Sequence, residues 1–385
     1  MMERIYLDYN ATTPVREEVL QGMMPFFCSQ FGNPASRHSA GQEAWNALEN
    51  AREKIAELAG AEPDDVIFTS GATESNFTAL LGRFETLVQQ GRNPESIHIA
   101  ISSIEHPCVK ACAERLKQRG AHVVSVPVRN EGTVNPAFFD DGVDWDIVSI
   151  MAVNHETGAI QPLNEIARRL DSDYTFFHTD AAQWAGRSHG NLQEWGVSAL
   201  SLSAHKLYGP KGIGVLILQR KHSVTPLFPG AQEAGLRAGT VNVPAAVGFG
   251  IAAQLIRQEQ VQEYHRLFEL REYFWNQMNA NDLHPQRTIV PELSMVNTLH
   301  VRFEGFRAER IVDSLDQKGI CCSAGPACSS GASDPSPVLL AMGCQESHAW
   351  EGIRFSLGKF TTRYDIDQTV QALTEIISPQ SQHVA

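Results

Sequence analysis

A lysine beside a hydroxyl and an imidazole is the clearest chemical feature of this chain. Ser203, His205 and Lys206 follow a short apolar segment and precede Gly209 and Pro210, so Lys206 is expected where a strand ends in a tight turn. An amine fixed there can form a Schiff base with the aldehyde of pyridoxal phosphate (PLP), while Ser203 and His205 donate to its phosphate. A surface loop lysine is the alternative for any single residue of this type.

An acid upstream of Lys206 supports the cofactor interpretation. Asp180 comes just past an apolar strand-like segment, Tyr174 to Phe177. A carboxylate there can keep a pyridinium nitrogen protonated, so that the ring works as an electron sink. Gln183 is a candidate for hydrogen bonding the phenolic oxygen of the same ring.

Two strand-to-helix turns offer further groups. Ala72 and Thr73 open a helix after a strand, where backbone N–H groups bind anions such as phosphate. His106, between Glu105 and Pro107, could stack on a ring and move protons, because its ordinary pKa lies near neutrality. A polar residue at a helix N-terminus explains His106 equally well without the context.

Two residues could bind a substrate. Asn154 follows an expected strand and could hydrogen-bond the cofactor or the substrate, with a solvated loop amide as the alternative. Arg354 lies in the apolar segment 352–356, and a buried arginine needs an anion. Its planar fork matches an amino-acid carboxylate, and an internal salt bridge is the alternative.

Segment 323–337 has no large apolar residue, so we expect a mobile tether that carries Cys328. A lone thiol on such a tether can reach a reaction centre and then an outside acceptor; an unreactive loop thiol is the alternative. The other cysteines are expected to pack as small hydrophobic residues. They are Cys28, Cys108, Cys112, Cys321, Cys322 and Cys344.

Strands and helices alternate along the first 220 residues or so, which predicts an α/β fold with a mostly parallel sheet covered on both faces. The expected strands are 66–69, 97–101, 122–128, 146–153, 174–177, 197–202 and 214–218. The expected helices begin at Ser39 (with a Ser39–Gln42 capping box), Thr73 and Pro107, and one spans 163–170. Ligands bind at the carboxyl ends of such strands, so His106, Asn154, Asp180 and Lys206 could converge.

A long helical pattern over 244–281 leads into a smaller α+β domain. Its expected strands are 297–303 and 352–356, and its expected helices are 308–317 and 365–377. We therefore predict a large domain of residues 15–257 and a small domain of residues 1–14 and 258–385, which carries Arg354 and Cys328.

Composition narrows the class of protein. A content of 43% hydrophobic and 19% charged residues is typical of a soluble globular protein, and a net charge of −13 argues against nucleic-acid binding. The longest apolar run, 243–253, contains a proline and is too short to span a membrane. Seven cysteines without a C-x-x-C pair favour a reduced cytoplasmic protein with neither disulfides nor a metal site.

Motifs in a consistent order from residue 5 to about 375 resemble the cysteine desulfurases of the NifS/IscS group, in the class V branch of the fold-type I PLP-dependent transferases. They are Tyr6–Pro14, Gly32–Pro34, Gly71–Asn76, Glu105–Pro107, Asn154–Gly158, His178–Gln183, Ser203–Lys206, Gln232–Thr240, the Cys328 segment and Arg354–Gly358.

The resemblance implies a role for each matched residue. Lys206 would bond the cofactor and act as acid and base, Asp180 would pair with the pyridinium, and His106 would stack on the ring. The phosphate would be held by Thr73, Ser203 and His205, with Thr240 from the other subunit of a homodimer. Asn154 and Arg354 would bind L-cysteine. Cys328 would be the nucleophile that becomes a persulfide, leaving L-alanine.

The persulfide would pass to a protein acceptor or scaffold in iron–sulfur cluster assembly or in tRNA or DNA sulfur modification. Three residues depart from the family pattern: His155 replaces an asparagine, Ala231 a glycine and Pro326 a serine. Pro326 could stiffen the entry to the cysteine-bearing segment, which bears on acceptor preference more than on chemistry. The alternatives are a selenocysteine lyase or another class V enzyme, which would not need Cys328, and a non-enzymatic sulfur-carrier scaffold.

Overall fold

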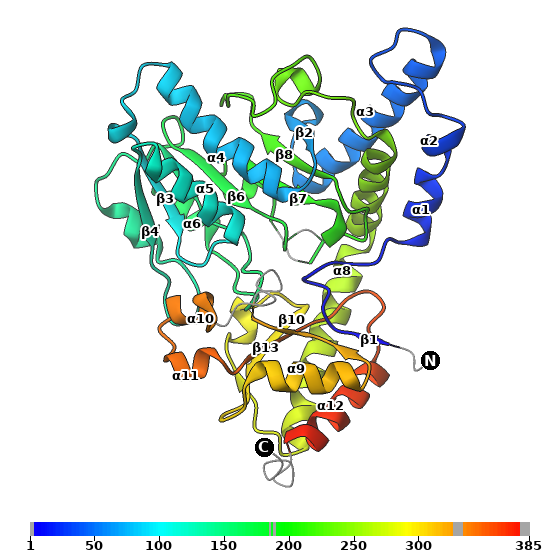
Figure 1. The fold of residues 1–385 in the computed structure, drawn as a ribbon, viewed down its shortest axis with the longest axis vertical. Helices are drawn as coiled ribbons and strands as arrows, with labels where there is room; N and C mark the ends of the chain where they lie inside the picture. Colours follow the sequence, from blue (N-terminus) through cyan, green and yellow to red (C-terminus); the bar gives the residue numbers. More distant parts are fainter. Residues whose placement is uncertain (1–3, 185, 188–189, 326–333, 378–385) are drawn as a thin grey trace.

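A seven-stranded sheet forms the centre of the larger part of the molecule (Figure 1). The computed structural model describes residues 4–184, 186–187, 190–325 and 334–377. In spatial order the strands are β2 (Val66–Thr69), β8 (Gly214–Leu218), β7 (Ala199–Ser203), β6 (Phe176–Asp180), β5 (Ile147–Ser149), β3 (His98–Ser102) and β4 (His122–Val126). Strand β8 is antiparallel to both neighbours and the other pairs are parallel, which confirms the predicted α/β fold with a mostly parallel sheet.

Helices cover both faces of this sheet, so the strands are apolar on both sides. Helices α4 (Ala72–Gln89) and α5 (Pro107–Gln118) pack on one face with Phe176 and Leu216. Helix α3 (Ser39–Ala59), α6 (Leu163–Ala167) and the first part of α8 (Val243–Ala280) pack on the other face with Phe177 and Val215. Neighbouring residues of one strand thus face opposite layers, as the two-residue repeat of a strand requires.

A smaller sheet lies at the far end of α8. Its order is β12 (Ser323–Ala324), β13 (Gly352–Ser356), β10 (Thr298–Arg302) and β9 (Gln286–Arg287), all antiparallel. Helices α9 (Ala308–Gln317) and α12 (Arg363–Ile377) and the end of α8 enclose its core, to which Leu7 also belongs. The short strands β1 (Ile5–Tyr6) and β11 (Ile320–Cys321) pair beside it. The domain boundaries proposed above remain a prediction.

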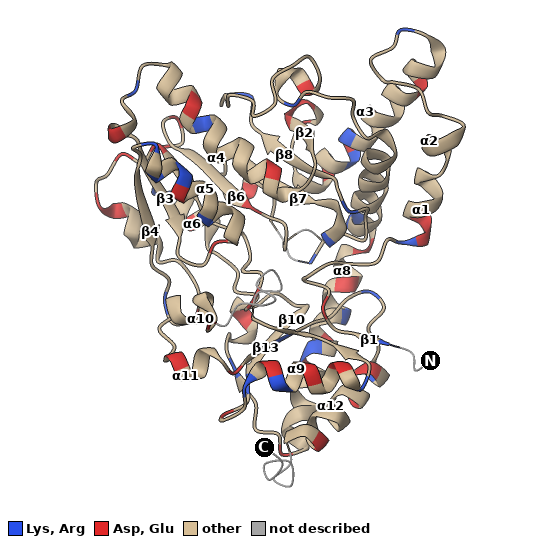
Figure 2. Cartoon of the chain, viewed as in Figure 1, with Lys and Arg blue, Asp and Glu red and all other residues tan. Residues whose placement is uncertain are grey.

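Short helices complete the described chain. They are α1 (Glu17–Met23), α2 (Pro25–Cys28), α7 (Leu192–Trp195), α10 (Pro337–Ala341) and α11 (Glu346–Ala349). Figure 2 shows acidic and basic residues on helices of both parts. Within the described ranges, no helix is both long and apolar enough to cross a membrane.

Several local predictions were wrong. Strand β6 spans Phe176–Asp180 where 174–177 was expected, β4 ends at Val126 rather than at residue 128, and α6 ends at Ala167 rather than at residue 170. Helix α3 is capped by His38, whose Nδ1 accepts from the Gly41 N–H at 3.2 Å, so Ser39 already lies inside the helix and makes no capping box. Strand β5 ends at Ser149, although the chain still follows β6 as far as the hydrogen bond from Ala152 N to Asp180 O. Asp180 is the last residue of β6 rather than a residue beyond it.

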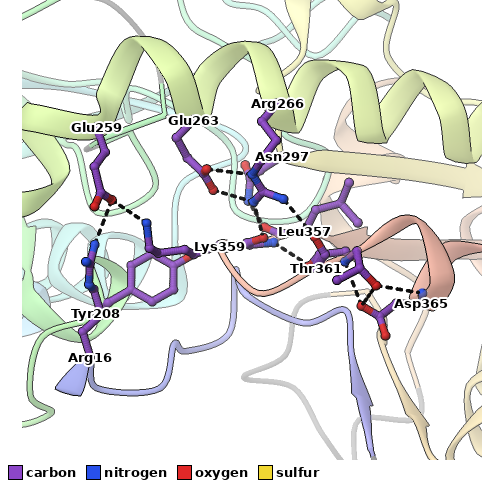
Figure 3. Close-up of polar contacts among 12 residues, drawn as sticks. Arg16, Tyr208, Glu259, Glu263, Arg266, Asn297, Leu357, Lys359, Thr361 and Asp365 are labelled. Carbon is purple, nitrogen blue, oxygen red and sulfur yellow. Dashed lines mark hydrogen bonds and ion pairs between the residues drawn. The ribbon is translucent and has the colours of Figure 1, made fainter.

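Charged groups on α8 join the two parts (Figure 3). Glu259 accepts from Arg16 at 2.8 Å and from Lys359 at 2.7 Å. The backbone N–H of Lys359 donates to the hydroxyl of Tyr208 at 2.8 Å. Since Tyr208 belongs to the turn after Lys206, this joint connects the lysine turn to the chain that follows β13.

Candidate active site

A cavity of about 590 Å³ lies at the carboxyl ends of β6 and β7 and at the N-terminus of α4. It brings together most of the residues predicted from the sequence. Those on its wall are Ala72, Thr73, His106, Asp180, Gln183, Ser203, His205, Lys206 and Arg354. Parallel strands with helices on both faces produce this convergence, because their carboxyl ends open on one edge of the sheet.

Lys206 is the last residue of a single helical turn, Ala204–Lys206, that follows β7. Its Nζ donates to the carbonyl oxygens of Asn10 and of Ala11, the latter at 2.9 Å. The buried Arg187 donates from Nη2 to the Lys206 carbonyl at 3.1 Å. The amine and the backbone of Lys206 are therefore both held in place at the cavity wall.

Asp180 is oriented by two N–H donors. Its Oδ2 accepts from Asn76 Nδ2 at 2.7 Å and its Oδ1 accepts from Ala182 N at 3.0 Å. Beneath it, the fully buried His178 lies between the hydroxyls of Ser149 and Ser201, at 2.9 and 3.0 Å. Burial lowers the pKa of His178 to about 4, so the ring is neutral at physiological pH.

The opposite end of the cavity suits a phosphate. Gly71, with φ of +156°, precedes α4, whose first N–H groups have no partner within the helix. A Cβ on Gly214 would lie 2.6 Å from the Gly71 Cα, so the backbones approach as only glycine allows. Burial, assisted by Lys206 and Lys211, lowers the pKa of His205 to about 4, so this ring can donate one N–H while remaining neutral. Donors at one end and the Asp180 carboxylate at the other fit PLP.

His106 caps α5 and accepts the Cys108 N–H at Nδ1, at 3.2 Å. Because Nδ1 accepts, the neutral ring carries its proton on Nε2. The His155 ring lies edge-on to it, 5.3 Å between centroids, and burial lowers the pKa of His155 well below its usual value. His155 and Cys108 both line the cavity.

Sequence patterns predict no role for these two wall residues, and His155 stands out only as a departure from the family pattern. Cys108 was assigned to the packed thiols, but it is half-buried, with Sγ 3.0 Å from His106 Nδ1. Cys28 was also assigned to them and is exposed, whereas Cys112 is buried as predicted. The position of Cys108 two residues after a helix-capping histidine is the signal that could have placed it in the cavity.

Arg354 combines the two possibilities left open by the sequence. The side chain is 1% exposed, lines the cavity and forms an ion pair with Asp8 at 2.6 Å. Its Nη1 donates to the His155 carbonyl at 2.7 Å. Its Nε is buried and has no hydrogen-bond partner among the described residues, so this N–H is available to another acceptor.

Three predicted residues are not on this wall. Asn154 is fully buried, and its Oδ1 accepts from the N–H groups of Glu156 and Thr157 at 3.0 and 2.9 Å. Thr240 lines a second hollow, of about 440 Å³. Cys328 lies outside the described residues. Among the residues that are described, no group of three or more His, Cys, Asp or Glu side chains could hold a metal ion.

Comparisons with known proteins agree with this geometry. Residues 5–369 match the aminotransferase class-V family. The chain is 40% identical to the cysteine desulfurase IscS of Dictyoglomus turgidum, covering 98% of this chain and 95% of the relative. It is 37% identical to the cysteine desulfurase NifS of Azotobacter vinelandii, over 98% and 93% of the two chains.

Solved structures show the same similarity. A NifS-like protein superposes with a TM-score of 0.89 at 34% identity, covering 97% of this chain and 99% of that chain. The protein SspA, solved in complex with cysteine, superposes with a TM-score of 0.79 at 30% identity, over 93% and 100% of the two chains.

Proposed function

We propose specific roles for three residues of this chain, which belongs to the class-V aminotransferase family and is a PLP-dependent cysteine desulfurase. Lys206 carries the cofactor, Arg354 binds L-cysteine and Cys328 accepts the sulfur of L-cysteine. The observation that carries the proposal is the single cavity whose wall includes Lys206, Asp180 and Arg354.

The residues at the two ends of the cavity would hold the cofactor. When bound, PLP supplies an electron-withdrawing ring that stabilises the electron pair left on the substrate. Asp180 would pair with the ring nitrogen and Gln183 would hydrogen-bond the ring oxygen. The phosphate would be held by the N–H groups of Ala72 and Thr73, by the Thr73 and Ser203 hydroxyls, and by His205.

Lys206 and His106 would move protons. Lys206 Nζ would take the α-proton of the substrate, and the carbonyl oxygens of Asn10 and Ala11, which already accept from Nζ, would hold the resulting ammonium. His106 would stack on the ring and exchange a proton through Nε2. The neutral His155 ring, edge-on to His106, would keep this wall uncharged.

Arg354 would bind the substrate carboxylate through its remaining N–H groups. The ion pair with Asp8 fixes the guanidinium plane beforehand, so that little side-chain entropy is lost on binding. Asn154 would contribute to the substrate site indirectly, since it shapes the turn whose His155 carbonyl holds Arg354.

The chain path supports Cys328 as the sulfur acceptor. Strand β12 pairs with β13 so that Ser323 lies opposite Arg354 and Ala324 opposite Ile353. Cys328 is four residues beyond Ala324, a contour of at most about 14 Å. Its thiolate would attack the substrate sulfur, the substrate carbon–sulfur bond would break, and its electron pair would stay on the organic product, which takes up protons to become L-alanine.

The partners are also part of the proposal. A second copy of the chain would bring Thr240 to the phosphate, and a protein acceptor would take the persulfide. Relatives named IscS and NifS, and structures titled SspA and DndA, are compatible with an iron–sulfur scaffold, a tRNA-thiolation relay or a DNA-modification protein as acceptor. We place the reaction in the cytoplasm, with no direct contact to nucleic acid or membrane.

Replacing Lys206 tests the cofactor site. Purified enzyme should be yellow and should give a borohydride-reducible link between PLP and the peptide that contains Lys206. Lys206→Ala, stripped of cofactor and given fresh PLP, should give no such link. Lys221→Ala is the control, because Lys221 is exposed and its Nζ donates to the Ser172 carbonyl, and it should give the normal link. A reducible link in Lys206→Ala would show that another amine carries the cofactor.

A further inference from the structure

The turn formed by residues 154–158 contacts two separate parts of the smaller sheet region. The His155 carbonyl accepts from Arg354 at 2.7 Å. The next side chain, Glu156, is fully buried, and its Oε1 accepts from the Ser336 hydroxyl at 2.5 Å. One turn of the large sheet therefore holds Arg354 and Ser336 at once.

Ser336 is the point at which the chain enters α10. Its side chain caps that helix by accepting the Leu339 N–H at 3.1 Å, and the residue is 6% exposed. At the other side of the cysteine-bearing segment, Ser323 is paired opposite Arg354 in β12 and β13. Both described ends of segment 325–335 are thus fixed around Arg354, one by strand pairing and the other by Glu156.

Burying the Glu156 carboxyl group carries a free-energy cost that its single hydrogen bond only partly offsets. Its Oε2 has no hydrogen-bond partner among the described residues, and neither has the nearby Nε2 of His300, which lies 3.8 Å from Oε1. Burial raises the pKa of Glu156 to about 7 and lowers that of His300 to about 3. A buried acid with one strong hydrogen bond and no close ion pair is typical of a position kept for a function.

We propose that Glu156 is a positioning residue for the sulfur-transfer step: by holding Ser336 beside the turn that also holds Arg354, it fixes the described residues that follow Cys328 in the chain. Sulfur transfer to Cys328 then depends on Glu156 and Ser336, whereas binding of L-cysteine depends on Arg354. The inference rests on the role proposed above for Cys328.

Variants of the hydrogen-bonded pair separate these two effects. In the PLP-loaded enzyme, Glu156→Leu and Ser336→Ala should each slow single-turnover persulfide formation about tenfold or more, the size expected when a buried hydrogen bond to an acid is lost. The L-cysteine concentration at half-maximal rate should stay within about twofold. The double variant should be no slower than Ser336→Ala, because Ser336→Ala already removes the hydrogen bond to Glu156 together with the cap of α10.

A conservative variant distinguishes positioning from general damage. Glu156→Gln keeps an oxygen that can accept from Ser336, so it should recover most of the rate. Burial raises the pKa of Glu156 to about 7, whereas a glutamine does not titrate. Glu156→Gln should therefore also remove the part of the pH dependence of the transfer rate near pH 7 that the Glu156 carboxyl causes. Cofactor content and the thermal midpoint identify misfolded variants, and Ser314→Ala, on the exposed face of α9, is the matched serine control.

The outcomes of this experiment are distinguishable. If Cys328→Ser forms no persulfide while Glu156→Leu and Ser336→Ala transfer sulfur at the normal rate, the positioning role is overturned and the proposed function stands. A raised half-maximal cysteine concentration with an unchanged maximal rate would also overturn it, because the turn would then serve Arg354 alone. If Cys328→Ser is fully active, the failure lies in the proposed function.

Discussion

Polar residues around the cavity are buried with specific partners, and this burial sets their protonation. His178 shows the effect most clearly, because it is fully buried between two serine hydroxyls and burial lowers its pKa from 6.5 to about 4. Its neutral ring supports Asp180, which begins the turn that lines the cavity. Burial lowers the pKa of His155 and His205 as well, so these three rings add no charge to the site.

His178 predicts an acid-dependent loss of stability. Between pH 6.5 and 4 the unfolded chain binds a proton at this position that the folded chain does not, so stability is complete above pH 6.5 and falls as the pH falls. The loss from this one group should reach at most about 3 kcal/mol. Urea unfolding of the wild type at pH 7.5 and pH 5, compared with His178→Gln, measures it. The wild type should lose more stability than the variant; equal losses would show that His178 does not contribute.

The site residues that were predicted correctly share one property. Each belongs to a motif that directly follows a predicted strand, so the motif indicates both the residue and its position at the carboxyl end of the sheet. Lys206, Asp180 and His106 are of this kind, and the cavity brings them together. Asn154 also sits in a motif, but its amide is used by its own turn, which spacing alone does not reveal. The ion pair between Asp8 and Arg354 joins residues 346 positions apart, so no local pattern could predict it.

Close approach of two backbones shapes the phosphate end of the cavity. Strand β8 brings Gly214 against Gly71, where a Cβ would lie 2.6 Å from the Gly71 Cα and from the Leu202 carbonyl oxygen. Backbone atoms cannot rotate away as a side chain can, so any larger residue must displace the N-terminus of α4 or the end of β7. Both segments contribute proposed phosphate ligands.

Gly214→Ala should therefore weaken PLP binding and lower stability by about 1–3 kcal/mol, as overpacking usually does. Gly91→Ala is the control, because it follows the opposite end of α4 and its Cβ would meet no atom within 4 Å, although its φ of +93° carries a strain of its own. Dialysis against free PLP, followed by cofactor absorbance, compares the two. Equal retention of PLP would show that the close approach has no part in the site.

Sequence patterns located nearly every strand because both faces of the sheet are covered, so each strand is a continuous apolar run. Strand β8 was found with its bounds, yet its antiparallel direction depends on the connection after the lysine turn, for which the pattern holds no signal. The true cap of α3 was missed because His38 caps with a ring nitrogen, whereas the usual capping residues are Ser, Thr, Asp and Asn.

Asn10 connects the two parts of the whole molecule at the cavity. Its carbonyl accepts from Lys206 and Gln183, and its amide bonds to residues of both parts, Arg187 on one side and Thr298 on the other. Together with the contacts of Glu259 in Figure 3, this links the position of Lys206 to the sheet that holds Arg354. A second copy of the chain would complete the assembly, since Thr240 lines a hollow separate from the lysine cavity.

Exposed apolar residues support this dimer. Several of them lie from α1 to α3, namely Leu20, Met24, Phe27, Phe31 and Trp45, and Trp45 also lines the hollow of Thr240. An apolar surface of this kind favours association. Sedimentation of the PLP-loaded enzyme should therefore give a dimer, and a stable active monomer would contradict it.

Mixed dimers test whether Thr240 crosses the interface. Homodimers of Lys206→Ala should be inactive, and homodimers of Thr240→Ala should hold PLP weakly. The mixed dimer has one Lys206→Ala subunit and one Thr240→Ala subunit. If Thr240 acts across the interface, one site combines both substitutions and the other site has an intact Lys206 and an intact Thr240. Half of the wild-type activity should then return at limiting PLP. If Thr240 serves its own subunit, neither site is intact and this recovery is absent.

The position of the transferred sulfur tests the central claim most directly. The enzyme should be mixed briefly with L-cysteine without reductant, trapped with an alkylating agent and mapped by peptide mass spectrometry. The account predicts one extra sulfur on Cys328 and none on Cys321 or Cys322. Burial raises the pKa of the Cys321 and Cys322 thiols, which makes them poor nucleophiles. Cys328→Ser should still bind PLP and change colour with L-cysteine, yet release no alanine. Extra sulfur on another cysteine, or normal turnover by Cys328→Ser, would contradict the account and favour a lyase that needs no thiol.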